Sequence, residues 1–229
     1  MVDGRVLKAF RRVKDRLKKG SNARKRTLAI NEYLRLIEKS PPHLRAVVTI
    51  AYNTGMRAGE IRQLKWSYVD RENGFIRLPK EITKERKKKN IPINCHVMEI
   101  IDNIPRALNH PFVITYKGRA ITRKEGLRRS FKTACTKAKI PYGRETENGI
   151  IFHDIRRTVK TNMLNAGLDK VHRDMILSHS LQGMDVHYMV SDDDSLKGAM
   201  DKYTRWIDDQ IANVDHPVDQ DKKTIKQRL

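Results

Sequence analysis

The sequence predicts a mainly α-helical domain with a small antiparallel β-sheet near its middle, an α+β fold. Apolar residues recur at helical spacing through most of the segments that could form a core. Two short segments on either side of residue 84 instead have strand character and flank a highly charged turn. A chain of 229 residues is long enough to bury such a core without disulfide bonds.

The first part of the chain contains three predicted helices. Residues 28–37 have apolar side chains close to helical spacing. A second helix starts with the prolines of Ser40 to Pro42, which fit a first turn, and continues through His43 to Asn53. Gly55 ends it, because glycine readily adopts the left-handed conformation that follows a helix. Residues 58–66 form a third, short helix.

The predicted sheet and the remaining helices follow in order. Residues 75–78 and 90–93 are short β segments, which form a hairpin or a meander around the charged turn. Helical patterns then cover residues 96–104, 123–139, 154–166, 170–178 and 198–211.

Positive charge is the strongest compositional signal. The chain has 48 Lys+Arg against 27 Asp+Glu, a formal net charge of +21. Residues 1–26, 77–90 and 117–139 contribute +9, +5 and +8, while residues 192–229 are slightly acidic. A single charge run is usually a solvated helix face. Three basic stretches and an acidic end indicate a surface that faces a polyanion, and we expect double-stranded DNA.

Several classes of protein are excluded. Only Cys95 and Cys135 are present, a count typical of a reducing compartment. There is no apolar run near 18 residues and no signal peptide, so we expect a cytoplasmic, DNA-associated protein and no membrane contact. No metal-ligand spacing is found among six of the histidines, which are His43, His96, His110, His172, His187 and His216. We therefore expect no metal site.

Two polar pairs and one pair of more distant residues could carry chemistry. His153 and Arg156 are three residues apart, so a helix presents both on one face near its N-terminus, where backbone N–H groups favour an anion. Arg57 and Glu60 have the same spacing, for which a helical ion pair is the ordinary explanation. Farther on, His179 precedes a tyrosine, Tyr188, by nine residues.

The order of these residues resembles the tyrosine recombinase (phage integrase) family. The motifs stand as TGMRAGEI, TKERKKKNIPI, HDIRRT, LSH and the terminal Tyr188. The resemblance covers about residues 27–211, and it implies the family's catalytic-domain fold there. Residues 1–26 would then be a basic arm or interdomain linker, and residues 212–229 a polar C-terminal tail.

The resemblance implies that the protein cuts and rejoins duplex DNA without metal, cofactor or ATP. Tyr188 would be the nucleophile and form a 3′-phosphotyrosyl bond. Arg57 and Arg156 would offset the charge that grows on the non-bridging oxygens, for which two forked guanidinium groups are well suited. His153 would act as a base or phosphate ligand, and His179 would donate a hydrogen bond to the phosphate.

The charged turn contains the expected general acid. The family's hairpin lysine lies eight residues before the proline of the second strand. Counting back from Pro92 selects Lys84 over the lysines at 87–89. Lys84 would protonate the departing 5′ oxygen, while Glu60 would support Arg57 and the fold.

The departures from the family pattern leave alternatives. Ser178 stands where glycine is common, and Tyr203 is a rival nucleophile. The short segment ahead of the match fits either an excised catalytic fragment or a short single-domain recombinase. A type IB topoisomerase-like enzyme and an inactive DNA-binding accessory protein are alternative functions to a recombinase that integrates or excises a mobile element.

The last predicted helix, Gly198 to Ile211, has one apolar stripe. Family resemblance suggests that it docks onto a neighbouring protomer, within a tetrameric synapse on DNA. The alternative is that the stripe packs onto its own domain.

Overall fold

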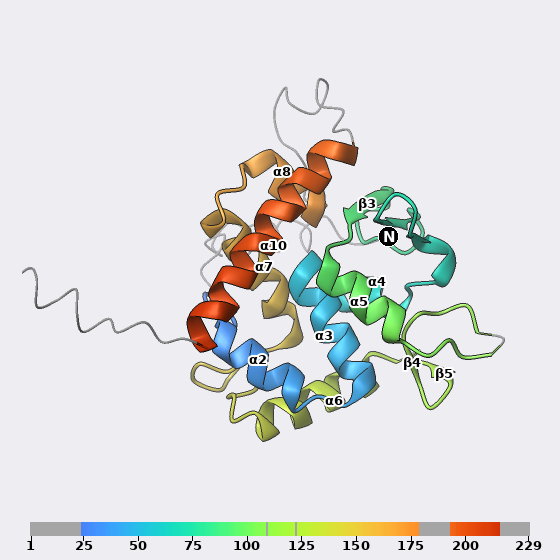
Figure 1. Ribbon diagram of the computed structural model, residues 1–229. Helices are drawn as coiled ribbons and strands as arrows, with labels where there is room; N and C mark the ends of the chain where they lie inside the picture. Colours follow the sequence, from blue (N-terminus) through green and yellow to red (C-terminus); the bar gives the residue numbers. More distant parts are fainter. Residues whose placement is uncertain (1–23, 109, 122, 179–192, 216–229) are drawn as a thin grey trace, which may run out of the picture.

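The fold is built around α3 (Pro42–Thr54), a helix enclosed by its neighbours. The structure, a computed structural model, describes residues 24–108, 110–121, 123–178 and 193–215 (Figure 1). Ten of the thirteen residues of α3 are buried, from Leu44 to Thr54. It starts at the two prolines and ends at Gly55, as predicted. This arrangement of helices around a small sheet confirms the predicted fold class.

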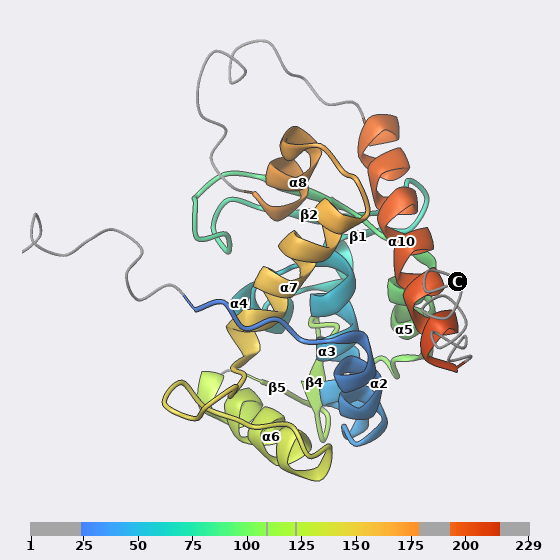
Figure 2. The same ribbon diagram turned by 90° about the vertical axis from the view of Figure 1, so that its left-hand side faces the viewer.

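Four helices, besides α6 (Lys124–Lys137), which is described below, pack against α3. These are α2 (Ile30–Glu38), α4 (Ala58–Arg62), α5 (Cys95–Asn103) and α7 (Phe152–Asn165). Figure 2 shows α3 and α7 side by side at the centre of the molecule. Helix α4 is shorter than predicted, because residues 66–68 form a separate 3₁₀ turn.

The main sheet has three antiparallel strands in the order β1-β2-β3. They are β1 (Val69–Asp70), β2 (Phe75–Leu78) and β3 (Lys89–Pro92). Phe75 pairs with Pro92 and Leu78 pairs with Lys89, so the charged turn of residues 79–88 closes the β2–β3 hairpin. The predicted hairpin is confirmed, and β1 makes it a meander.

The second half adds a small hairpin and two helices. Strands β4 (Thr115–Tyr116) and β5 (Arg119–Ala120) form a separate two-stranded sheet. Helix α6 (Lys124–Lys137) follows it along the lower edge of the molecule in Figure 1. Helix α8 (Lys170–Leu177) packs against α7 and β3, which places its C-terminal end beside Gly55.

The expectation that residues 198–211 dock onto a neighbouring protomer is wrong for this structure. They belong to a longer helix, α10 (Asp193–Asp215), which packs against α2, α8 and β3 of its own domain. Met200, Tyr203 and Ile207 are buried in the core. The apolar stripe was identified correctly, but its own domain offers the complementary apolar surface.

Arg24 attaches the N-terminal segment to the domain. Its guanidinium donates to both carboxylate oxygens of Asp154, in the first turn of α7, at 3.0 to 3.2 Å. It also donates to the carbonyl of Arg144 at 3.0 Å and to that of Gly149. Asp154 is buried, and it also accepts from the backbone N–H of Ile151 at 2.9 Å. The chain therefore enters the domain beside the N-terminus of α7.

Among the described helices, none has the length and apolar character needed to cross a bilayer.

Gly55 lies where α3, α7 and α8 meet, and its substitution is expected to be costly. Its φ is +67°, and a Cβ there would lie 2.3 Å from Leu177 Cδ2 and 3.2 Å from Val159 Cγ1. Gly55→Ala should lower the free energy of unfolding by about 2–4 kcal/mol, from left-handed strain plus overpacking. Urea denaturation measures this. Gly59→Ala is the control, because a Cβ at Gly59 meets nothing within 4 Å; an equal loss there would contradict the explanation.

Candidate active site

Arg57 is held in place by Glu60, one helical turn later. Arg57 is the residue just before α4, and its backbone N–H donates to Glu60 Oε2 at 2.9 Å. Its Nη1 donates to Glu60 Oε1, also at 2.9 Å. The Glu60 carboxylate therefore caps the helix and orients the guanidinium at once. The helical ion pair expected from the spacing is present.

Lys89, the first residue of β3, pairs with the same Glu60 carboxylate. It is only 2% exposed, and its Nζ lies 3.2 Å from Glu60 Oε2. Burial lowers the pKa of Lys89 to about 8, although the Glu60 carboxylate opposes the shift and Arg156 and Arg57 add to it. Burial alone would raise the pKa of Glu60, but Lys89 and Arg57 hold it below its ordinary value. Lys89 thus remains mostly protonated near neutral pH.

Arg156 lies on α7 and is anchored by backbone carbonyls. Its Nη1 donates to the carbonyl of Gly55 at 2.7 Å, and its Nη2 donates to that of Leu177. The residue is 6% exposed, and burial, followed by repulsion from Arg57, lowers its pKa to about 10. A buried cation that is fixed by neutral acceptors retains its charge for an incoming anion. Arg57 and Arg156, 99 positions apart in the sequence, thus interact in one site.

His153 lies in the first turn of α7, one turn before Arg156. Much of its surface is accessible to solvent. Partial burial of the ring, and then the nearby charge of Arg156, lower its pKa below the ordinary value, while Asp154 opposes the shift. The imidazole is therefore mainly neutral near pH 7 and can accept a proton.

Lys84 lies in the β2–β3 turn with its side chain exposed. Thr83 closes this turn, since its hydroxyl donates to the carbonyl of Lys87 at 2.7 Å. Lys84 forms no hydrogen bond or ion pair with any of the residues that the structure describes. Its neighbour Glu85 instead points inward, and both of its carboxylate oxygens accept from Arg57.

Two expected site residues, His179 and Tyr188, lie outside the described residues, so their assignment stays a prediction. The described stretch ahead of them ends at Ser178, which has a φ of +49° and ends α8 in the left-handed conformation. That conformation explains why glycine would suit this position. The rival nucleophile Tyr203 is fully buried, and its hydroxyl donates to the carbonyl of Tyr52 at 2.9 Å.

Sequence reasoning missed two members of the site, Lys89 and Glu85. Both belong to a run of charged residues in which spacing does not reveal which side chains face inward. The register of β3 offered one signal, because Lys89 pairs with the buried Leu78 at the start of a strand. Among the described residues, no group of three or more histidine, cysteine or acidic side chains is arranged to hold a metal.

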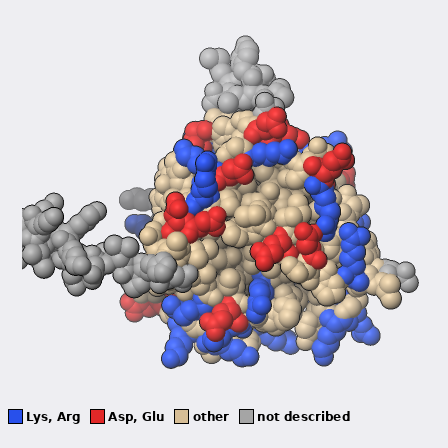
Figure 3. Space-filling model, in the orientation of Figure 1, with Lys and Arg blue, Asp and Glu red and all other residues tan. Residues whose placement is uncertain are grey.

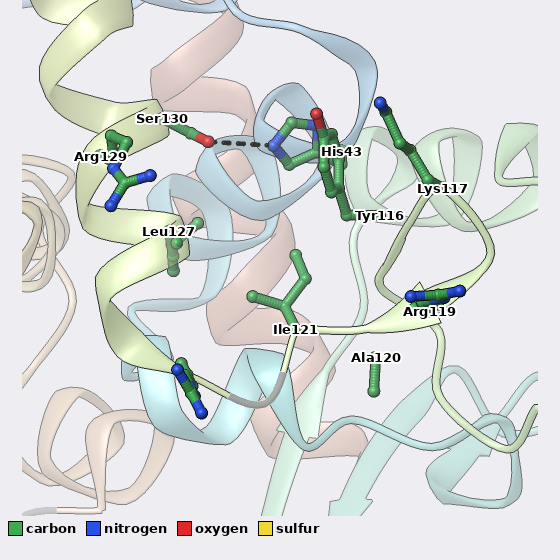
Figure 4. A pocket seen from close by; sticks show the side chains of 11 residues that line it. His43, Tyr116, Lys117, Arg119, Ala120, Ile121, Leu127, Arg129 and Ser130 are labelled. Atoms are coloured by element: carbon green, nitrogen blue, oxygen red, sulfur yellow. Dashed lines mark hydrogen bonds between the residues drawn. The ribbon is translucent and has the colours of Figure 1, made fainter.

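Two basic pockets lie on either side of α6. A pocket of about 790 Å³ between α4, α6 and α7 includes His153, Lys124 and Arg128. A second pocket of about 710 Å³ is lined by the β4–β5 hairpin, α6 and the start of α3 (Figure 4). In it, His43 and the hydroxyl of Ser130 lie 3.2 Å apart, and the ring of Tyr116 packs against that of His43.

The second pocket is strongly cationic. Its described lining contains four basic side chains and no carboxylate, the basic ones being Lys117, Arg119, Arg123 and Arg129. Figure 3 shows Lys and Arg gathered along the lower edge of one face, where α6 lies in Figure 1, while the rest of that face mixes both signs. The surface around α6 is therefore suited to bind a polyanion.

Two guanidinium groups, the buried one of Arg156 and the partly exposed one of Arg57, lie together on this mainly helical fold, an arrangement suited to bind a phosphate. Comparison with known proteins gives the same class, since residues 25–194 match the phage integrase family. The chain therefore belongs to the phage integrase family, the tyrosine recombinases, which confirms the resemblance noted in the sequence.

Two curated relatives extend the comparison. The integrase of Salmonella phage P22 is 28% identical over 156 residues, which are 64% of this chain and 39% of the relative. A shufflon-specific DNA recombinase of Escherichia coli is 24% identical over 200 residues, 82% of this chain and 48% of the relative. The chain thus spans less than half the length of either relative.

Solved structures share the fold. The integrase from mycobacterium phage Brujita matches with a TM-score of 0.63 and 19% identity, over 82% of this chain and 64% of that one. The lambda integrase catalytic core matches with a TM-score of 0.56 and 22% identity, over 68% of this chain and 96% of that one. These likenesses establish the architecture, and the chemistry has to be argued from the site itself.

Proposed function

We propose that this chain is the catalytic part of a site-specific DNA recombinase that integrates or excises a mobile element. Residues 27–211 would form the catalytic domain, residues 1–26 a basic arm or linker, and residues 212–229 a polar tail. The observation that carries the proposal is the cluster of Arg57, Arg156 and Lys89 around the single buried carboxylate of Glu60. This cluster keeps an excess of positive charge even with Glu85 paired to Arg57, whose side chain is partly exposed.

The proposed reaction is a transfer of one phosphodiester bond to the protein and back. The hydroxyl of Tyr188 attacks phosphorus, gives its proton to a base, and forms a 3′-phosphotyrosyl bond. The bond to the 5′ oxygen breaks, and Lys84 protonates that oxygen. The reverse sequence with a new 5′ hydroxyl rejoins DNA without ATP, because the phosphotyrosyl bond stores the energy of the original bond.

The remaining residues have supporting roles. Arg57 and Arg156 offset the charge on the non-bridging oxygens, and Glu60 positions Arg57. His153, with its lowered pKa, acts as the base or as a phosphate ligand. His179 donates a hydrogen bond to the phosphate.

Because guanidinium groups supply the positive charge, cleavage should proceed in EDTA.

The basic pockets around α6 support a duplex DNA partner, since their cations can follow a phosphate backbone that leaves the site. One structural relative is a lambda integrase tetramer bound to a Holliday junction. We propose that this chain also self-associates on DNA, through surfaces other than the buried stripe of α10.

The decisive experiment uses a library of nicked duplexes with randomised sequence, labelled on the strand that would become linked. The reaction is run at low salt with EDTA, because a single domain with few phosphate contacts binds weakly at high salt. A denaturant-stable protein–DNA adduct on a restricted set of sequences supports the recombinase. Adducts on all sequences would favour a type IB topoisomerase-like enzyme. Salt-sensitive retention without any adduct would favour an accessory DNA-binding protein.

A further inference from the structure

Glu85 pairs with the Arg57 guanidinium in addition to Glu60. Arg57 Nη1 donates to Glu85 Oε2 at 3.0 Å, and Nη2 donates to Glu85 Oε1. The two oxygens of one carboxylate therefore meet two nitrogens of one guanidinium. Two non-bridging oxygens of a phosphodiester pair with guanidinium in the same forked geometry.

The two acidic partners of Arg57 differ in how readily they can leave the guanidinium. Glu60 is 2% exposed and also binds Lys89 and the backbone of Arg57, so its removal would leave buried groups without partners. Glu85 has a side chain that is 23% exposed, and it lies in the β2–β3 turn rather than in a helix or strand. Glu85 can therefore leave Arg57 for solvent without any loss of core packing.

Charge balance permits the exchange of Glu85 for a phosphate. Arg57, Arg156 and Lys89 contribute three positive charges, while Glu60 and Glu85 contribute two negative ones. Glu85 also interacts electrostatically with Arg156, so it partly compensates both guanidinium groups. A phosphodiester carries one negative charge, as Glu85 does. The exchange would leave the balance of the cluster unchanged.

We propose that Glu85 holds the place of the DNA phosphate in the free protein and is displaced from Arg57 when a backbone phosphate binds. This inference rests on the proposed function, because it takes Arg57 as a phosphate ligand. Glu85 thereby sets the affinity of the site for phosphodiesters. Lys84 precedes Glu85 in the same short turn, so displacement of Glu85 moves Lys84 as well. The exposed position that Lys84 has in this structure is then its position in the protein without DNA.

The test measures anion binding at Arg57 and needs no turnover. Inorganic sulfate, a tetrahedral mimic of phosphate, is titrated into the full chain while the NMR signals of the Arg57 and Arg156 Nε–H groups are followed. Glu85→Gln keeps the shape of the side chain and removes its charge. It should tighten sulfate binding by about threefold to tenfold, as expected for loss of a partly exposed competing ion pair.

A matched control removes the general effect of one negative charge in this turn. Glu81 lies in the same turn, is exposed, and forms no ion pair among the residues that the structure describes. Glu81→Gln should change sulfate affinity by less than about twofold, the size of a screened surface effect. Equal changes in the two variants would overturn the proposal. Weaker sulfate binding by Glu85→Gln would also overturn it, because Glu85 would then be positioning Arg57 rather than competing for it.

The outcome separates this inference from the proposed function. If Glu85→Gln tightens sulfate binding but no nicked duplex yields an adduct, the competing-anion role stands and the recombinase activity does not. If the wild type forms the adduct but the two glutamine variants bind sulfate alike, the recombinase activity stands and the role of Glu85 does not.

Discussion

Tyr188→Phe is expected to abolish the denaturant-stable protein–DNA adduct while leaving non-covalent DNA binding within about twofold of the wild type. Only the hydroxyl can form the phosphotyrosyl bond, so no residual adduct is expected. Binding depends instead on many cations, including those around α6, and the substitution removes none of them. Denaturing gels with a nicked duplex measure the adduct, and fluorescence anisotropy measures binding.

Tyr203→Phe is the control for the identity of the nucleophile. The hydroxyl of Tyr203 is buried against the carbonyl of Tyr52, and burial raises its pKa well above the ordinary value. It can neither reach DNA nor ionise readily in this fold. This variant should lose about 1 kcal/mol of stability, from one missing hydrogen bond, and still form the adduct. An adduct that survives Tyr188→Phe and disappears in Tyr203→Phe would reverse the assignment.

Lys84→Ala is expected to slow cleavage by roughly 10²–10⁴, the usual contribution of a positioned general acid. DNA binding should change little, because several other basic residues remain in residues 77–90. A substrate with sulfur in place of the bridging 5′ oxygen needs no proton on its leaving group. It should therefore restore most of the lost rate, which single-turnover kinetics would measure.

The structure makes the sulfur substrate a sharp test among the lysines of the turn. Lys89 is buried against Glu60, so Lys89→Met should slow cleavage by disturbing Arg57 and should not be rescued by sulfur. Arg156→Ala should also resist rescue, because Arg156 acts on non-bridging oxygens. Rescue of a lysine variant at 87, 88 or 89, with Lys84→Ala still slow, would move the general acid to that residue. The proposal that the chain is a recombinase would not be affected by that result.

Most of the fold could be predicted because its signals are local. Helix α3 begins at its prolines and ends at Gly55, where the sequence places both boundaries. The β2–β3 hairpin follows from two apolar segments around a charged turn. Strands of two residues, such as β4 and β5, are too short to show any periodicity, and these were not predicted.

The site was predicted only in part, for a different physical reason. The helical spacing between Arg57 and Glu60 already implied their contact. Contacts between distant segments depend on which charged side chain of a run faces inward, and composition carries no such information. Glu85 and Lys89 were missed for this reason. The apolar stripe of α10 likewise predicted burial but could not identify the covering surface.

Arg24 links the entry of the chain into the domain to the helix end that presents His153. Its guanidinium pairs with the buried carboxylate of Asp154, the residue that follows His153 in the first turn of α7. Removal of Arg24 would leave this carboxylate buried without its cation, which is costly in free energy. A substitution at Arg24, far from His153 in the sequence, would therefore disturb the helix turn on which His153 lies.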